Sequence, residues 1–100
     1  MGVNMKMIQQ MQTRLEKIQK ELADTVVEGV AGGGVVKAQV TGQREFRGIS
    51  IDPSAVDPDD VEMLEDLVTV AIQDAMNRAT TLAEEKMGAL TGGMRIPGLM

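Results

Sequence analysis

Apolar residues recur along this chain with two different periods, and the first of them is helical. From about Asn4 to Asp24 they are spaced three and four residues apart, which places them on one face of an amphipathic α-helix. This face consists of Ile8, Met11, Leu15, Ile18 and Leu22. Because the spacing is a regular seven-residue repeat, the face is suited to packing against another helix, and we predict that it forms a dimer interface.

Between residues 25 and 51 apolar residues alternate with polar ones, which predicts three short β-strands. Gly32–Gly34 separate the first two strands, and Gly42 and Gln43 form a tight turn into the third. Two successive hairpins give a three-stranded antiparallel meander, whose apolar face needs a covering helix. Because the three glycines join two strands, and not a strand to a helix, they do not indicate a phosphate-binding loop.

The third strand contains one irregularity in its pattern. Phe46 is out of phase with Ile49 and Ile51. One extra residue in this strand would return all three side chains to the same face. We therefore predict a β-bulge near Arg47 and Gly48.

A second helical pattern predicts a long helix over residues 58–87. Asp57 is suited to the N-cap and Pro58 to the first helical position, and acidic residues in the first turn complement the positive end of the helix dipole. The acidic residues around this helix start lack the glycine and the spacing of a calcium-binding loop. Capping and solubility therefore account for them.

The second half of this helix carries small apolar residues between Ala71 and Ala83, which would permit the close approach of another helix. Gly88 is expected to end the helix. The glycines and the proline that follow are unfavourable in a helix, so residues 88–100 are expected to form a flexible tail.

These elements predict a single α+β domain over residues 1–100, in the order α-β-β-β-α, with two long helices flanking the sheet. The helices would be about 31 Å and 43 Å long, whereas a seven-residue strand covers only about 23 Å. Both helices must therefore extend beyond the sheet and leave apolar residues uncovered in a monomer. We expect a homodimer with twofold symmetry, in which a second copy covers them.

Charge is distributed unevenly along the chain, although the net charge is −5. Residues 1–20 carry a local charge of +3, whereas residues 52–85 carry −9. The N-terminal cations share the helix side opposite the apolar face, and they are Lys6, Arg14, Lys17 and Lys20. By its pattern alone this basic face is either a solvated surface or a binding surface for an anionic partner.

The composition excludes several classes of chemistry. The chain has no cysteine and no histidine, so it lacks disulfides, the commonest metal ligands and the usual nucleophile–base pairs. Phe46 is its only aromatic residue, so it cannot stack bases on an aromatic platform. We expect no enzymatic activity, no metal, no cofactor and no small-molecule substrate. Without an apolar run of about 18 residues or a secretory signal, we also expect no membrane association and a cytoplasmic location.

Five motifs resemble, in order, those of a bacterial protein family. They are VEGVAGGGVVKAQVTG, ISIDP, DPDDVEMLEDL, AIQDAMNRA and EKMGALTGGMRIPGL, within about residues 22–100. On these motifs the chain resembles the YbaB/EbfC family of nucleoid-associated proteins. Residues 1–21 resemble the family only in character, as a Met- and Gln-rich amphipathic helix.

The resemblance implies a tweezer-like homodimer that binds double-stranded DNA in the nucleoid and alters its conformation, with effects on nucleoid organisation, gene expression or DNA protection. In this family the DNA-binding surface is placed on the projecting helices. The cations at the corresponding positions are Lys6, Arg14, Lys17 and Lys20, and on the second helix Arg78 and Lys86. Because Arg14 is the only arginine of the basic face that could contact guanine through two hydrogen bonds, we expect little sequence specificity.

An alternative function is that of a protein–protein interaction adaptor. In that case the heptad-patterned helix and the C-terminal tail would bind a protein partner. The net negative charge favours the adaptor, whereas the basic face and the family resemblance favour DNA.

Overall fold

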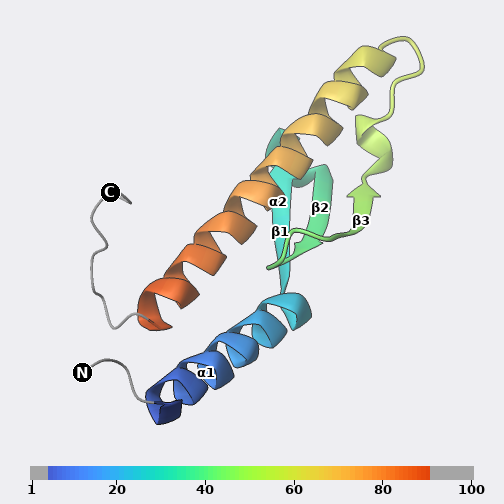
Figure 1. Cartoon of the computed structure of the whole chain (residues 1–100). Coiled ribbons are helices and arrows are strands. Elements are labelled where there is room, and N and C mark those ends of the chain that lie inside the picture. Colours follow the sequence, from blue (N-terminus) through green and yellow to red (C-terminus); the bar gives the residue numbers. More distant parts are fainter. Residues whose placement is uncertain (1–4, 91–100) are drawn as a thin grey trace.

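The computed structural model describes residues 5–90 of the 100-residue chain and has the predicted α+β architecture. Helix α1 (Met5–Asp24) is followed by strands β1 (Val26–Ala31), β2 (Val36–Thr41) and β3 (Phe46–Ile51), and then by the long helix α2 (Val61–Leu90) (Figure 1). Two short 3-10 turns, η1 (Gly32–Gly34) and η2 (Pro53–Ala55), follow β1 and β3. The predicted order α-β-β-β-α is confirmed.

The three strands form one antiparallel sheet in the order β1-β2-β3, which confirms the predicted meander. The register between β2 and β3 shifts between Gln39 and Val40, and this shift leaves Arg47 as an extra residue in β3. The shift is the predicted β-bulge. It pairs Phe46 with Val40, and so returns Phe46 to the face that carries the other apolar side chains of β3.

The turn between β1 and β2 requires glycine. All three residues of η1 have positive φ angles, from +61° at Gly32 to +101° at Gly34. Residues with a side chain rarely adopt these angles, so the three glycines are explained by the geometry of the hairpin. The interpretation of this segment as a hairpin loop is confirmed.

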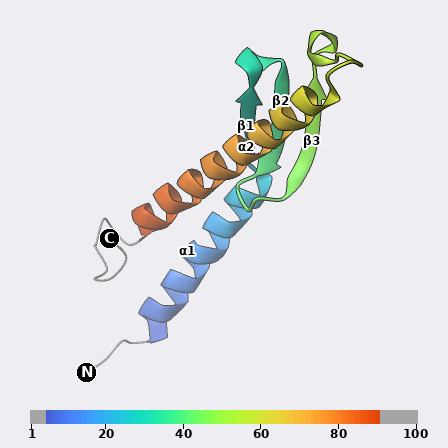
Figure 2. The same ribbon diagram turned by 90° about the horizontal axis from the view of Figure 1, so that it is seen from above.

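α2 lies across one face of the sheet, above β1 and β2 (Figures 1 and 2). The buried core consists of small and β-branched side chains: Ala31, Val36, Ala38, Val40, Ala71, Ala75 and Ala79. Gly29 of β1 faces Ala71 and Ala75, and a Cβ atom at Gly29 would overlap their backbone atoms. The close approach at this part of α2 is therefore made by a strand. At Ala71 and Ala75 a strand takes the place that the small residues would allow a helix, because glycine in β1 removes the side chain that would keep the two backbones apart.

α2 begins three residues later than predicted, so the prediction of a start at residue 58 is wrong. Asp57 belongs to a separate turn, in which its carbonyl accepts the backbone N–H of Asp60 over 2.9 Å. The N-cap is Asp60, whose Oδ1 atom accepts the Met63 N–H over 3.2 Å, and helix α2 starts at Val61. Both aspartates have the chemistry of a cap. The Oδ1 atom of Asp57 accepts the Asp59 N–H within that turn over 2.9 Å, so the cap of the helix falls to Asp60.

α2 also ends later than predicted: it continues through Gly88 and ends at Leu90. A glycine inside a helix costs only about 1 kcal/mol relative to alanine, which the rest of a 30-residue helix can offset. Of the predicted tail, residues 88–90 are therefore helical. Residues 91–100, like residue 4 of the predicted first helix, lie outside the described residues.

One strand of the sheet is left uncovered on its core side. α2 lies over β1 and β2, and β3 lies beyond it (Figure 1). Phe46, Ile49 and Ile51 share the face that β1 and β2 bury, yet they are 54%, 37% and 38% exposed. The protomer thus leaves a row of apolar side chains accessible beside α2.

Candidate nucleic-acid interface

Helix α1 is anchored to the protomer at its C-terminal end. Leu22 is 3% exposed and packs on Gly42 in the turn between β2 and β3. The Gly42 N–H donates to the Leu22 carbonyl over 2.9 Å, and the Gln43 side-chain amide donates to the Gln19 carbonyl over 3.0 Å. A side chain at Gly42 would overlap Leu22, so glycine lets this turn close against the helix. From this anchor α1 projects away from the sheet (Figure 2).

The projecting part of α1 carries the predicted basic face. Its four cations are all exposed: Lys6, Arg14, Lys17 and Lys20. With Gln9, Gln10 and Thr13 between them, Lys6 and Arg14 line a shallow surface cavity of about 460 Å³. From Lys6 to Lys20 the face extends over about 21 Å of helix. Its ammonium, guanidinium and amide groups are donors of the kind that bind phosphate oxygens.

Lys86 of α2 lies at the base of this face, in an ion pair with α1. Its Nζ atom is 3.1 Å from Oε2 of Glu21, and the two side chains are 32% and 43% exposed. By helical geometry Glu21 lies on the same side of α1 as the basic residues. Lys86 therefore offsets an acidic group that would otherwise repel an anion near the end of the basic face. The sequence did not indicate this pair, because 65 residues separate its members.

Arg78 of α2 is placed beside β1 and not beside α1. Its Nε atom donates to Oδ2 of Asp74 over 3.0 Å, and the same oxygen accepts the Val30 N–H of β1 over 3.0 Å. The hydrogen bond from Val30, and then the contact with Arg78, lower the pKa of the Asp74 carboxyl. Asp74 thus fastens α2 to the edge of the sheet. The structure does not bring Arg78 together with the cations of α1.

The apolar face of α1 is uncovered over most of its length. Ile8, Met11 and Leu15 are 38%, 46% and 37% exposed, and Ile18 is half-buried. Leu22 is buried against the β2–β3 turn of its own protomer. Of the five residues predicted to form a dimer interface, four therefore present an apolar surface, and the fifth belongs to the anchor of α1.

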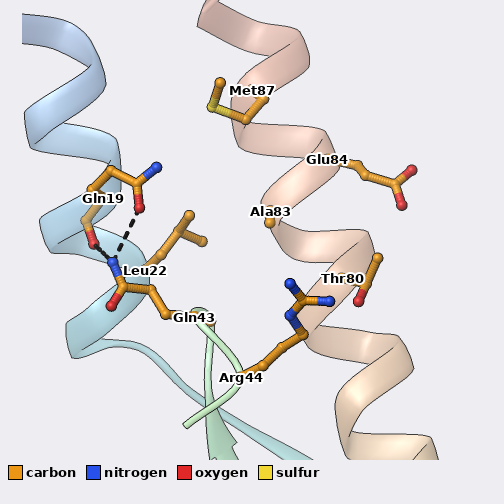
Figure 3. A pocket seen from close by; sticks show the side chains of 9 residues that line it. Gln19, Leu22, Gln43, Arg44, Thr80, Ala83, Glu84 and Met87 are labelled. Atoms are coloured by element: carbon orange, nitrogen blue, oxygen red, sulfur yellow. Dashed lines mark hydrogen bonds between the residues drawn. The ribbon is translucent and has the colours of Figure 1, made fainter. Parts of the chain in front are cut away.

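The structure also contains a groove that the sequence did not indicate. α1 and α2 enclose a cavity of about 480 Å³ above the β2–β3 turn (Figure 3). Leu22 lines it from α1, Ala83 and Met87 from α2, and Arg44 from the turn. Arg44 has a φ angle of +66°, in the left-handed region. Gly42 and Gln43 indicated this turn in the sequence, but they gave no information about the two helices that meet there.

Within residues 5–90, no helix has an apolar stretch long enough to cross a membrane. The same residues contain no cluster of three or more acidic, histidine or cysteine side chains that could hold a metal ion.

Comparison with known proteins gives a consistent result. A family model described as the YbaB/EbfC DNA-binding family matches residues 1–94. Nucleoid-associated proteins from Chloroflexus aurantiacus and Mycobacterium tuberculosis are 56% identical over 91 residues and 51% identical over 89 residues. These matches cover 91% of both chains in the first case, and 89% of this chain and 67% of the relative in the second.

A nucleoid-associated protein from Desulforamulus reducens is 50% identical over 99 residues, which cover 99% of this chain and 94% of the relative. Among solved structures, an uncharacterised protein from Helicobacter pylori matches with a TM-score of 0.62 and 19% identity, over 88% of this chain and 99% of that chain. At this identity the match shows a shared fold.

Proposed function

This chain belongs to the YbaB/EbfC DNA-binding family, and from that premise we propose that it binds double-stranded DNA through the basic face of α1. The observation that carries the proposal is the family match together with four exposed cations on a projecting helix: Lys6, Arg14, Lys17 and Lys20. The family is a DNA-binding family and not an enzyme family. Because the relatives are nucleoid-associated proteins, we propose the nucleoid of the cytoplasm as the location.

The chemistry of the basic face supports binding with little sequence specificity. Lysine and arginine side chains neutralise phosphates whatever the base sequence, and the release of counterions supplies the free energy of binding. Arg14 is the only arginine of this face, and it carries the only planar guanidinium that could form two hydrogen bonds with a guanine edge. The acidic residues of the segment 52–85 lie at Asp52 before η2, between η2 and α2, and on α2, so repulsion holds that part of the protein away from the duplex.

A homodimer is the second part of the proposal, because one protomer leaves two apolar surfaces uncovered. The first is the exposed part of the heptad face of α1, from Ile8 to Ile18. The second is the apolar row on β3, formed by Phe46, Ile49 and Ile51. A second copy related by a twofold axis would cover apolar surface and duplicate the basic face. Two basic faces in fixed relation provide the means to bend or bridge DNA and so to alter its conformation, nucleoid organisation, gene expression or DNA protection.

An electrophoretic mobility shift with random-sequence duplex DNA at low salt tests this function. We expect a shift with every duplex of sufficient length, and little preference among sequences. The absence of a shift at low salt would overturn the proposal. It would favour the second candidate, a protein–protein adaptor, which is supported by the net charge of −5 and the exposed heptad face of α1.

A further inference from the structure

The groove between α1 and α2 has an apolar interior. On the α1 side its polar residues, Gln19 and Gln43, are hydrogen-bonded to each other. The Gln43 side-chain amide donates to the Gln19 carbonyl over 3.0 Å and to Gln19 Oε1 over 3.1 Å (Figure 3). Leu22, Ala83 and Met87 line the space between the helices. Nothing within residues 5–90 occupies it, and its volume is about 480 Å³.

The chain itself continues from the open end of this groove. α2 ends at Leu90, one helical turn beyond Met87. Ten residues follow, TGGMRIPGLM, and they are mostly apolar beyond Gly92 and Gly93. A pair of glycines permits a reversal of chain direction at low cost.

The lengths allow this segment to return into the groove. Ala83 lies seven residues before Leu90, which is about 10 Å along the helix axis. The six residue steps from Leu90 to Ile96 reach up to about 20 Å when extended. Ile96 can therefore be brought alongside Ala83 after a reversal at the two glycines.

The apolar residues of the segment fit the same groove. Leu22, Ala83 and Met87 supply its apolar lining, and the one carboxylate of the lining, Glu84, is balanced by the one guanidinium, Arg44. The segment has a single charged side chain, Arg95, with apolar residues on both sides. The match therefore rests on apolar contact and not on charge.

We propose that residues 94–99 of the chain bind in the groove between α1 and α2 of the same protomer, with Ile96 against Leu22 and Ala83. The bound segment fills the space between the two helices. It thereby fixes the direction in which α1 projects, which the anchor at Leu22 constrains only at one end. This inference concerns the protomer alone and does not depend on the proposed DNA binding.

Disulfide trapping tests the proposal in the full chain, because the chain has no cysteine of its own. Ala83→Cys combined with Ile96→Cys is expected to form an intramolecular disulfide at least about tenfold faster than Thr81→Cys combined with Ile96→Cys. Thr81 is the matched control, since it is exposed and lies about 200° away around α2 at almost the same distance from Leu90. Equal rates for the two pairs would overturn the proposal.

Two further measurements address a folding defect in the first variant and the possibility that the segment comes from another copy. If Ala83→Cys disturbs folding, the comparison is repeated at two exposed positions of α2. Met87→Cys combined with Met94→Cys should then form the intramolecular disulfide faster than Glu85→Cys combined with Met94→Cys. Mixing ¹⁵N-labelled and unlabelled protein before oxidation shows by mass spectrometry which chain supplies the segment. Disulfides that join labelled to unlabelled peptides would show that the groove takes the segment of another copy, and would overturn the assignment to the same protomer.

Discussion

Gly29 of β1 lies directly against Ala75 of α2, and the lack of a side chain at Gly29 sets the distance between the sheet and the helix. A Cβ atom on Gly29 would lie 2.7 Å from the Ala75 Cα atom and would also overlap the Ala71 carbonyl. Ala71, Ala75 and Ala79 have no exposed surface. α2 therefore cannot move away from β1 without opening the core that holds it on the sheet.

The first prediction is that Gly29→Ala destabilises the protein by about 1–3 kcal/mol, because the added methyl group overpacks this contact. For a domain of this size each kcal/mol lowers the melting temperature by roughly 4–8 °C, which circular dichroism measures. Gly48→Ala is the control, since a Cβ there would meet only Gln39 Oε1 at 3.7 Å, an ordinary contact. Equal melting temperatures for the two variants would contradict the role assigned to Gly29.

The second prediction concerns the position of the DNA-binding face. Lys17→Glu combined with Lys20→Glu changes two exposed residues, so the free energy of unfolding should change by less than about 0.5 kcal/mol per site. DNA affinity should fall at least about tenfold, because each reversal replaces a phosphate partner with a repulsive charge. Mobility shifts measure the affinity, and circular dichroism verifies the fold.

Arg47, in the bulge of β3, is the matched control for this experiment. Lys17→Glu alone and Arg47→Glu alone change the net charge equally, and both positions are exposed. Arg47→Glu should therefore affect binding much less than Lys17→Glu. If Arg47→Glu abolishes binding and the α1 variants do not, the DNA face is the sheet.

The third prediction is a steep dependence of DNA binding on salt. If three or four cations of each protomer contact phosphates in a dimer, log K against log salt should have a slope of roughly −5 to −7. In the Lys17→Glu, Lys20→Glu variant the slope should become shallower by roughly 3 to 4, since four contacts are lost per dimer. A slope near zero for the unaltered protein would rule out a phosphate-based interface.

The fourth prediction is that the protein sediments at low micromolar concentration with twice the mass of one 100-residue chain. Leu15→Asp should raise the dimer dissociation constant at least about tenfold, because it would place an unpaired carboxylate in an apolar contact. Thr13→Asp, an exposed position on the polar side of the same helix, should leave the dimer intact. If the Leu15→Asp variant stays dimeric and the Ile49→Asp variant dissociates, the interface lies on β3.

A sedimentation mass equal to that of one chain for the unaltered protein would overturn the proposal of a homodimer.

The fifth prediction follows from the lowered pKa of Asp74, caused first by the Val30 N–H and then by Arg78. A carboxyl with a lower pKa in the folded state contributes stability above its unfolded pKa of about 3.9, and this contribution is lost as pH falls through the folded pKa. Asp74→Asn should therefore destabilise the protein at pH 7 and have a smaller effect near pH 2. Urea unfolding at both pH values measures the difference. Asp66→Asn, at an exposed position of the same helix, is the control substitution.

Several features of the fold were predictable from the sequence because each depends on local spacing. The spacing of apolar residues shows which side of each helix or strand is apolar. This holds for the three-and-four spacing in α1, the alternation in β1, β2 and β3, and the long apolar face of α2. The bulge at Arg47 was predictable because one extra residue reverses the phase of Phe46. The basic face of α1 was visible for the same reason, since its four cations recur at helical spacing.

What the sequence could not reveal depends on contacts between distant residues. Asp57 and Asp60 are equally good caps, and only the turn at Asp57 shows that α2 begins at Val61. The family resemblance made Lys86 a candidate for DNA binding, whereas the fold places it in an ion pair with Glu21. The alanines of α2 suggested the close approach of a helix, whereas the neighbour of Ala71 and Ala75 is Gly29 of β1. Spacing along one element determines which of its faces is apolar or charged, but only the packing of separate elements decides which partner each face meets.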